Sequence, residues 1–204
     1  MIPFVHLHVH SYYSILDGQA SISRLVDKAI ADGMRGMALT DHGNMMGVKD
    51  FFNYVQKKKG GASKDFKKAE AQLKEFQTKA QEAGAEPCSV VLDDGKTLAD
   101  AMAETEKAME KAKRVMDFKP IIGCEMYCAR RTKFDKTLKE DRSGWHLVVL
   151  AKNEVGYHNL VKLVSRAWVD GFYMKPRTDK ADLEQFKEGL IISSACLGGE
   201  IPRK

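Results

Sequence analysis

Hydrophobic and polar positions follow two different patterns along this chain. Residues 1–58 and 118–204 read as short apolar runs followed by amphipathic stretches, the pattern of alternating strands and helices. The expected strands are 4–10, 36–40, 120–127, 145–151 and 190–194, and the expected helices are 21–32, 48–58, 153–168 and 180–187. This alternation favours an α/β fold with parallel strands, in which residues 190–194 form a buried strand.

The middle segment, residues 59–117, has a different period. Apolar side chains and alanines recur there at spacings of three and four, the period of a helix packed along one seam. These positions are Phe66, Ala69, Leu73, Phe76, Ala80 and Ala83, then Leu98, Met102, Thr105, Met109, Ala112 and Met116. Two seams separated by a turn-rich stretch predict an antiparallel helical hairpin inserted between a helix and the next strand. A disordered charged linker is the alternative, because alanine-rich seams bury little apolar surface.

Composition narrows the class of protein. With 44% hydrophobic and 30% charged residues, the 204-residue chain can bury a core, which excludes wholesale disorder and a disulfide scaffold. A net charge of +5 permits contact with nucleic acid but is too small to indicate it alone. No apolar run approaches a membrane span and the first residues lack signal-peptide character, so we expect a cytoplasmic protein without a membrane partner. Its four cysteines, with no CxxC pairing, are expected to be thiols.

Three of the six histidines fall close together. His6, His8 and His10 alternate with apolar residues, so a strand over 4–10 would place all three imidazoles on one face. Imidazoles at positions i and i+2 of a strand point at the same place and can share a metal ion. For any one of these histidines, a surface or core role accounts for the residue as well as metal binding does. For all three together, that alternative is weaker than metal binding.

Further metal-binding side chains lie near the ends of the apolar runs. Asp17 falls in a turn where Gly18 allows the chain to bring the carboxylate back over the end of the first strand. Asp41 and His42 follow the run 36–40, at the strand exit where α/β barrels carry their working groups.

A second group of candidates lies later in the chain. Glu125 is placed within an apolar strand, where a carboxylate needs a paired charge or a metal. His146 opens the strand 145–151 and Cys196 follows the strand 190–194. A set of imidazole, carboxylate and thiol donors suits zinc, manganese or iron, and its size implies more than one ion. Clustered ions are typical of phosphoester hydrolysis.

Seven motifs carry a resemblance to one known family. They are residues 6–11 (HLHVHS), 14–18 (SILDG), 40–44 (TDHGN), 120–125 (PIIGCE), 146–153 (HLVVLAKN), 171–177 (GFYMKPR) and 194–202 (SACLGGEIP). In order and spacing they resemble the PHP (polymerase and histidinol phosphatase) domain, in the form that opens the α subunit of bacterial replicative DNA polymerase III. The resemblance covers residues 1–58 and 118–204.

The resemblance implies a fold and a ligand set. The fold is a distorted (βα)7 barrel with up to three divalent ions (zinc, manganese or magnesium) at the C-terminal ends of its strands. His6 is outside the implied set. The implied metal ligands are His8, His10, Asp17, His42, Glu125, His146 and Cys196.

Two features depart from the family pattern. Family members carry an Asp-x-His pair downstream of the 194–202 motif, and the chain stops at Lys204, so we expect a barrel that is incomplete at its C-terminus and a longer parent polymerase. His146 begins its predicted strand, which is the wrong end for a barrel site.

In the basic loop 171–177, Lys175 and Arg177 are expected either to meet DNA phosphates or to be solvated.

The resemblance also implies a function. The whole protein would carry out templated DNA synthesis in a later domain, and this region would contribute either a metal-dependent 3′–5′ exonuclease or a metal-stabilised scaffold. Implied partners are DNA and, through the full-length protein, a proofreading exonuclease subunit and a sliding clamp. The alternatives are a free-standing phosphatase of the same family and a catalytically silent module that docks the proofreading subunit.

Overall fold

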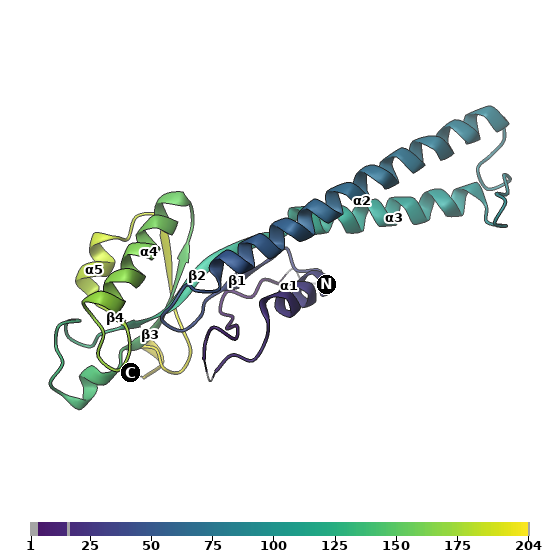
Figure 1. Cartoon of the computed structure of the whole chain (residues 1–204). Helices are drawn as coiled ribbons and strands as arrows, with labels where there is room; N and C mark the ends of the chain where they lie inside the picture. Colours follow the sequence, from purple (N-terminus) through teal and green to yellow (C-terminus); the bar gives the residue numbers. More distant parts are fainter. Residues whose placement is uncertain (1–3, 16, 204) are drawn as a thin grey trace. The chain divides into compact units, whose positions relative to one another are not determined.

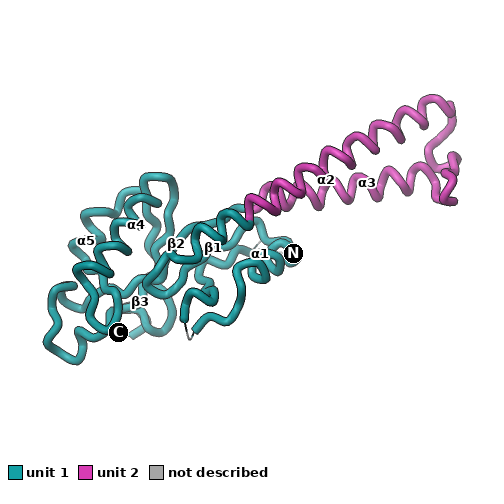
Figure 2. Tube along the Cα trace, in the orientation of Figure 1, with its two compact units in different colours: residues 1–54, 119–204 teal, residues 55–118 magenta. Residues whose placement is uncertain are grey.

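The computed structural model describes residues 4–15 and 17–203, which form two compact units (Figures 1 and 2). Unit 1 consists of residues 1–54 and 119–204, and unit 2 of residues 55–118. Unit 1 combines helices with a five-stranded mixed sheet, which confirms the predicted α/β class. No helix among the described residues is long and apolar enough to cross a membrane.

The sheet of unit 1 has the order β1-β2-β3-β5, with β4 beside the end of β2. Its strands are β1 (Gly36–Leu39), β2 (Lys119–Cys128), β3 (Trp145–Ala151), β4 (Arg177–Thr178) and β5 (Leu190–Ser194). β1 and β4 run parallel to β2, whereas β3 runs antiparallel to both β2 and β5. The prediction of an all-parallel sheet is therefore wrong, and within the described residues the sheet does not close into a barrel.

The antiparallel pair follows from the connection between its strands. Residues 129–144 contain only a short 3-10 helix, η1 (Lys139–Arg142), between β2 and β3. A parallel return needs a crossover of a dozen or more residues, usually a helix packed on the sheet. Without a packed crossover helix, β3 returns directly alongside β2 in the opposite direction.

The helices of unit 1 begin where the sequence places capping residues. α1 (Ile22–Ala31) begins after Ser21, whose side chain accepts a hydrogen bond from the Arg24 N–H. α4 (Glu154–Val169) begins after Asn153, as predicted, and α5 (Lys180–Gln185) begins after Asp179. α4 covers the sheet through a cluster of buried residues formed by Cys124, Met126, Val149, Leu160, Leu163 and Ala167. Each fully buried leucine there contributes about 1.5–3 kcal/mol.

Two expected strands differ in the structure. Residues 4–10 are irregular and form a single bridge, His6 to Met37. The N–H of Val9 bonds to the side-chain Oγ1 of Thr40 (2.9 Å) and not to a backbone carbonyl, which interrupts the ladder. β5 forms but is mostly exposed, because among the described strands it pairs only with β3.

Unit 2 contains most of α2 (Val48–Ala83) and all of α3 (Leu98–Asp117). α2 continues through Gly60 and Gly61, so the expected helix end at residue 58 is wrong; two interior glycines cost only about 1 kcal/mol each. Phe76 packs against Leu98 and Ala101, and the two helices run side by side, joined at one end by residues 84–97 (Figure 2). The hairpin predicted from the two apolar seams is therefore present.

Candidate metal centre

Glu125 forms the floor of the site. Its neighbours in β2, Cys124 and Met126, join the core under α4, so strand alternation directs Glu125 to the opposite face, where it is 0% exposed. Burial raises the pKa of this carboxyl group, but the surrounding imidazoles of His10, His146, His42 and His8 outweigh burial and hold the pKa far below its usual range. Glu125 is therefore an ionised, buried carboxylate.

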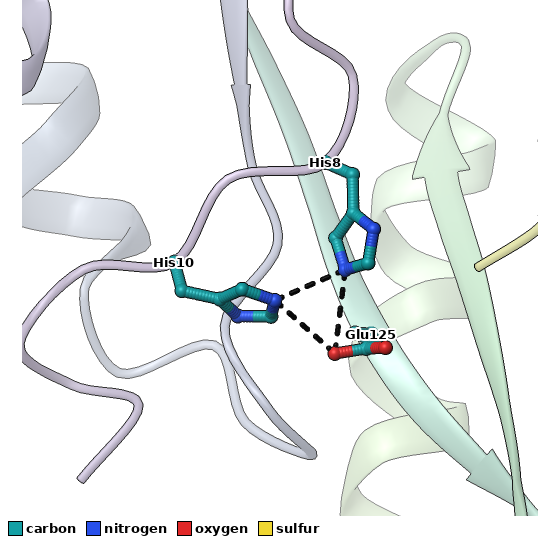
Figure 3. Close-up of side chains that lie close together, drawn as sticks. All are labelled: His8, His10 and Glu125. Carbon is teal, nitrogen blue, oxygen red and sulfur yellow. Dashed lines mark hydrogen bonds and ion pairs between the residues drawn. The ribbon is translucent and has the colours of Figure 1, made fainter. Parts of the chain in front are cut away.

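Two imidazoles from residues 4–10 converge on one oxygen of Glu125 (Figure 3). His8 Nε2 lies 3.3 Å and His10 Nε2 lies 3.2 Å from Glu125 Oε2, and the two nitrogens are 3.0 Å apart. Three ligand atoms about 2.1 Å from one ion would be separated by about 3.0–3.4 Å, so this spacing fits a shared divalent ion. The two rings are 29% and 23% exposed, which leaves them accessible to solvent.

His42 approaches the same oxygen from the end of β1. It forms a bridge with Glu125, and its Nδ1 lies 2.6 Å from Glu125 Oε2. Both atoms are buried, yet neither has a hydrogen-bond partner among the residues that the structure describes. The carboxylate nevertheless raises the pKa of His42, against the opposing effect of burial. Buried polar atoms crowded together without hydrogen bonds indicate a position suited to a cation.

His146 and Cys196 face the other oxygen of Glu125. His146 Nδ1 lies 2.8 Å from Oε1, and Cys196 Sγ lies 3.4 Å from His146 Nδ1 and 3.7 Å from Oε1. Because β3 is antiparallel to β2, its first residues pair with the last residues of β2, with Tyr127 opposite His146. The expectation that His146 lies at the wrong end is thus wrong: the strand boundary is as predicted, and the strand direction is reversed.

Asp17 reaches the group from the turn formed by the motif at residues 14–18. Leu16 of this motif lies outside the described residues. Asp17 Oδ2 lies 3.2 Å from His42 Nε2, and its side chain is 65% exposed. Gly18 makes this turn possible, because a Cβ there would lie 1.8 Å from the backbone oxygen of Ser11. His6 is exposed and packs against Phe4, outside the site, as expected.

A buried hydrogen-bond network supports these ligands. Asp41 is 2% exposed, and its Oδ1 accepts from Ser11 N (2.7 Å) and Ser14 Oγ (2.7 Å) while its Oδ2 accepts from Ser11 Oγ (2.9 Å). Ser14 Oγ also accepts from the His42 backbone N–H (3.0 Å) and lies 3.1 Å from His10 Nδ1.

This network determines which nitrogen of His10 carries the proton. Ser14 has one hydroxyl proton and gives it to Asp41, which as a carboxylate only accepts. The Ser14 oxygen must then accept from His10, so the proton lies on His10 Nδ1. Whenever the ring is neutral, Nε2 therefore carries the lone pair, which is the state a metal ligand requires.

Sequence reasoning missed Ser14 and Asp41 as supporting residues. Asp41 was noticed only as a polar residue at a strand exit beside His42. The available signal was alternation, since neighbours at the end of a strand point in opposite directions and only one of the two can face Glu125. The partnership with Ser14 spans 27 positions and has no local signal.

The two basic residues expected to meet phosphate have different surroundings. Lys175 is exposed, and its Nζ lies 5.4 Å from the centre of the Tyr127 ring. Arg177 is 0% exposed, and its guanidinium donates hydrogen bonds to four backbone oxygens, those of Gly171, Lys133, Asp135 and Asp141. The expectation of a phosphate contact is therefore wrong for Arg177, whose buried guanidinium holds loops together.

Comparison with known proteins adds the family. The family model described as the PHP domain matches residues 6–204. DNA polymerase III subunit alpha is 40% identical in Borreliella burgdorferi, 36% in Treponema pallidum and 33% in Thermus aquaticus, over 98%, 98% and 99% of this chain. The chain spans only 12% of the length of each of these relatives. Since the family model covers nearly every residue, including all those gathered around Glu125, the chain belongs to the PHP domain family.

Proposed function

We propose that this chain is a metal-dependent phosphodiesterase that acts on the 3′ end of single-stranded DNA, as part of a bacterial DNA polymerase III α subunit. One observation carries the proposal. Three imidazole nitrogens lie within 3.3 Å of Glu125 Oε2, and that buried oxygen accepts no hydrogen bond from the described part of the chain. A site of this kind is costly without a cation to occupy it.

The donors fall into two groups that share Glu125. His8 and His10 form one group with it, and His42 and His146 form the other. A carboxylate common to both groups can bridge two ions, with Asp17 and Cys196 as additional ligands. Divalent ions held there would polarise a phosphoryl group and lower the pKa of a coordinated water, the chemistry of phosphodiester hydrolysis.

The side chains of this chain then have separate roles. The ionised Glu125 would balance the positive charge of divalent ions held there, and the buried network of Asp41 and Ser14 keeps the His10 lone pair available. Lys175 is the nearby exposed cation suited to a substrate phosphate, and the partly exposed imidazoles leave the substrate a route from solvent.

The relatives motivate the wider part of the proposal. Each named relative is a DNA polymerase III subunit alpha, so we assign templated DNA synthesis to another part of the parent protein. DNA, a proofreading exonuclease subunit and a sliding clamp are the proposed partners of that protein. We also propose that residues 59–117 are an insertion in a single PHP domain, which is interrupted and not divided by the hairpin.

Metal content and hydrolysis test the proposal together. The purified chain, loaded with zinc or manganese and desalted, is expected to retain bound metal by elemental analysis but to digest DNA weakly, whereas a chain extended through the expected Asp-x-His pair should retain more than one equivalent and shorten 5′-labelled single-stranded DNA from its 3′ end. Glu125→Gln should lose the ions and the activity, because the amide removes the shared charge. Glu154→Gln is the matched control, since that side chain is 90% exposed. A wild-type chain that retains no metal, or an extended chain that binds metal and hydrolyses no phosphodiester, would overturn the assignment.

A further inference from the structure

Two exposed aromatic rings lie at the end of α4. Trp168 and Phe172 are 43% and 46% exposed, and their rings stack at a centroid distance of 5.5 Å and an interplanar angle of 19°. A stacked pair of large side chains that stays this exposed is unusual for a purely structural contact, and exposed apolar patches mark interaction sites.

The aromatic pair is attached to the candidate metal centre. The Trp168 indole N–H donates to the backbone oxygen of Gly43 (2.8 Å), and Gly43 directly follows His42. A Cβ at Gly43, whose φ is 61°, would lie 2.7 Å from Pro176 Cγ, so the loop 171–177 packs directly on the His42 turn. The last turn of α4 lies beside β4, which follows this loop (Figure 1).

The loop 171–177 is fixed at its base. The buried side chain of Arg177 donates to the backbone oxygen of Gly171 (3.1 Å) and closes the loop. At the tip, Met174 has φ 61° and is 67% exposed; it is the non-glycine residue with positive φ among those described. Such a conformation costs about 1–3 kcal/mol and persists where the surrounding structure imposes it. Phe172 and Met174 therefore present a preorganised apolar surface.

The same loop carries a cation near the candidate metal centre. Lys175 Nζ is exposed and lies 5.4 Å from the Tyr127 ring centre, and Tyr127 is stacked on His42 at 6.2 Å. Exposed aromatic rings next to a basic group form the combination that binds single-stranded nucleic acid, with bases stacked on the rings and phosphates at the cation.

We infer that Trp168 and Phe172 form a base-stacking platform for a single-stranded nucleic acid whose backbone phosphate lies at Lys175. The inference rests on the proposed phosphodiesterase function and adds to it the means by which a nucleotide substrate is distinguished from other phosphoesters. Stacking on one ring is worth about 1–3 kcal/mol per base. The platform therefore predicts binding that depends on the base and not on the phosphate alone.

Fluorescence anisotropy with two oligonucleotides tests the platform. The probes are oligodeoxythymidylate and an abasic deoxyribose-phosphate strand of equal length, measured with EDTA so that neither metal nor cleavage contributes. We expect the wild-type chain to bind the thymidine strand about 5- to 150-fold more tightly. Phe172→Ala should remove most of this preference and Phe172→Trp should retain it. Phe52→Ala is the matched control, because Phe52 is also 46% exposed but lies beside Pro120 and Ile122 at the start of β2.

The outcomes separate this inference from the proposed function. Equal affinity for the two strands, or equal losses in Phe172→Ala and Phe52→Ala, would overturn the platform, whatever the metal measurements show. Base-dependent binding that Phe172→Ala abolishes would support it even if the metal-loaded chain proved inactive. Lys175→Ala should weaken binding of both strands alike and reduce its salt dependence, because it removes a phosphate contact.

Discussion

Replacing Ser14 by alanine tests the most specific feature of the candidate metal centre. Ser14 is 1% exposed and touches neither Glu125 nor His8, so its effect on metal binding must pass through other residues. Its hydroxyl donates to Asp41 and accepts from the His42 backbone N–H, and through these bonds it fixes the proton on His10 Nδ1.

The size of the effect follows from these contacts. Removing the hydroxyl leaves the partly buried His42 N–H without that partner, at a cost of at most about 1–3 kcal/mol in the free energy of unfolding. The imidazole of His10 becomes free to carry its proton on Nε2, which competes with metal binding. Loss of a residue that orients a metal ligand lowers metal affinity by about 10–100-fold.

Two measurements check this prediction. Isothermal titration with zinc or manganese should show the weakened affinity. ¹⁵N NMR of the imidazoles in the metal-free chain should show the neutral His10 ring protonated on Nδ1 in the wild type and as a mixture of the Nδ1–H and Nε2–H tautomers in Ser14→Ala. Ser193→Ala is the control, because Ser193 is exposed and its hydroxyl donates to the backbone oxygen of the next residue, Ser194. A wild-type His10 protonated on Nε2, or a Ser14→Ala chain with unchanged affinity, would refute the reasoning.

Three further predictions concern other parts of the chain. His8→Ala should lose more than one equivalent of bound metal, because the ions share Glu125, whereas His6→Ala should lose none; equal losses would contradict the ligand assignment. Phe76→Asp should speed hydrogen exchange in unit 2 while β2 stays protected, since the aspartate would be buried against α3. The ion pair with Arg131 lowers the pKa of Asp141 from 3.8 to about 2, so this pair stabilises the fold above pH 3.8 and is lost as the pH falls through 2. Urea unfolding at a series of pH values measures the free energy of unfolding. Between pH 3.8 and 2 this free energy should fall less steeply in Asp141→Asn than in the wild type, and an unchanged dependence on pH would argue against the pair.

Much of the chemistry of this site is readable from single residues. A carboxylate in an apolar strand, histidines two positions apart and a thiol after a strand each have few stable uses, and all of these predicted residues are brought together around Glu125. Local signals were equally informative for helix starts, as at Asn153, because a capping hydrogen bond spans only three residues.

Strand direction and burial were decided only by the tertiary structure. An apolar run such as 145–151 reads identically in either direction, and only the connection to β2 makes it antiparallel and places His146 beside the floor of the site. The exposure of β5 depends on which strands surround it. Burial of Arg177 depends on backbone oxygens from residues 133–141, to which no local pattern points.

The sequence by itself determined the donors, the helical hairpin and the α/β class, because these depend on side-chain chemistry and on short periodic patterns. The tertiary structure decided how the donors are held. The proton on His10 is assigned by Ser14 and Asp41, which lie on separate segments and meet only after folding. Long-range hydrogen bonds of this kind depend on three-dimensional placement, which no spacing along the chain encodes.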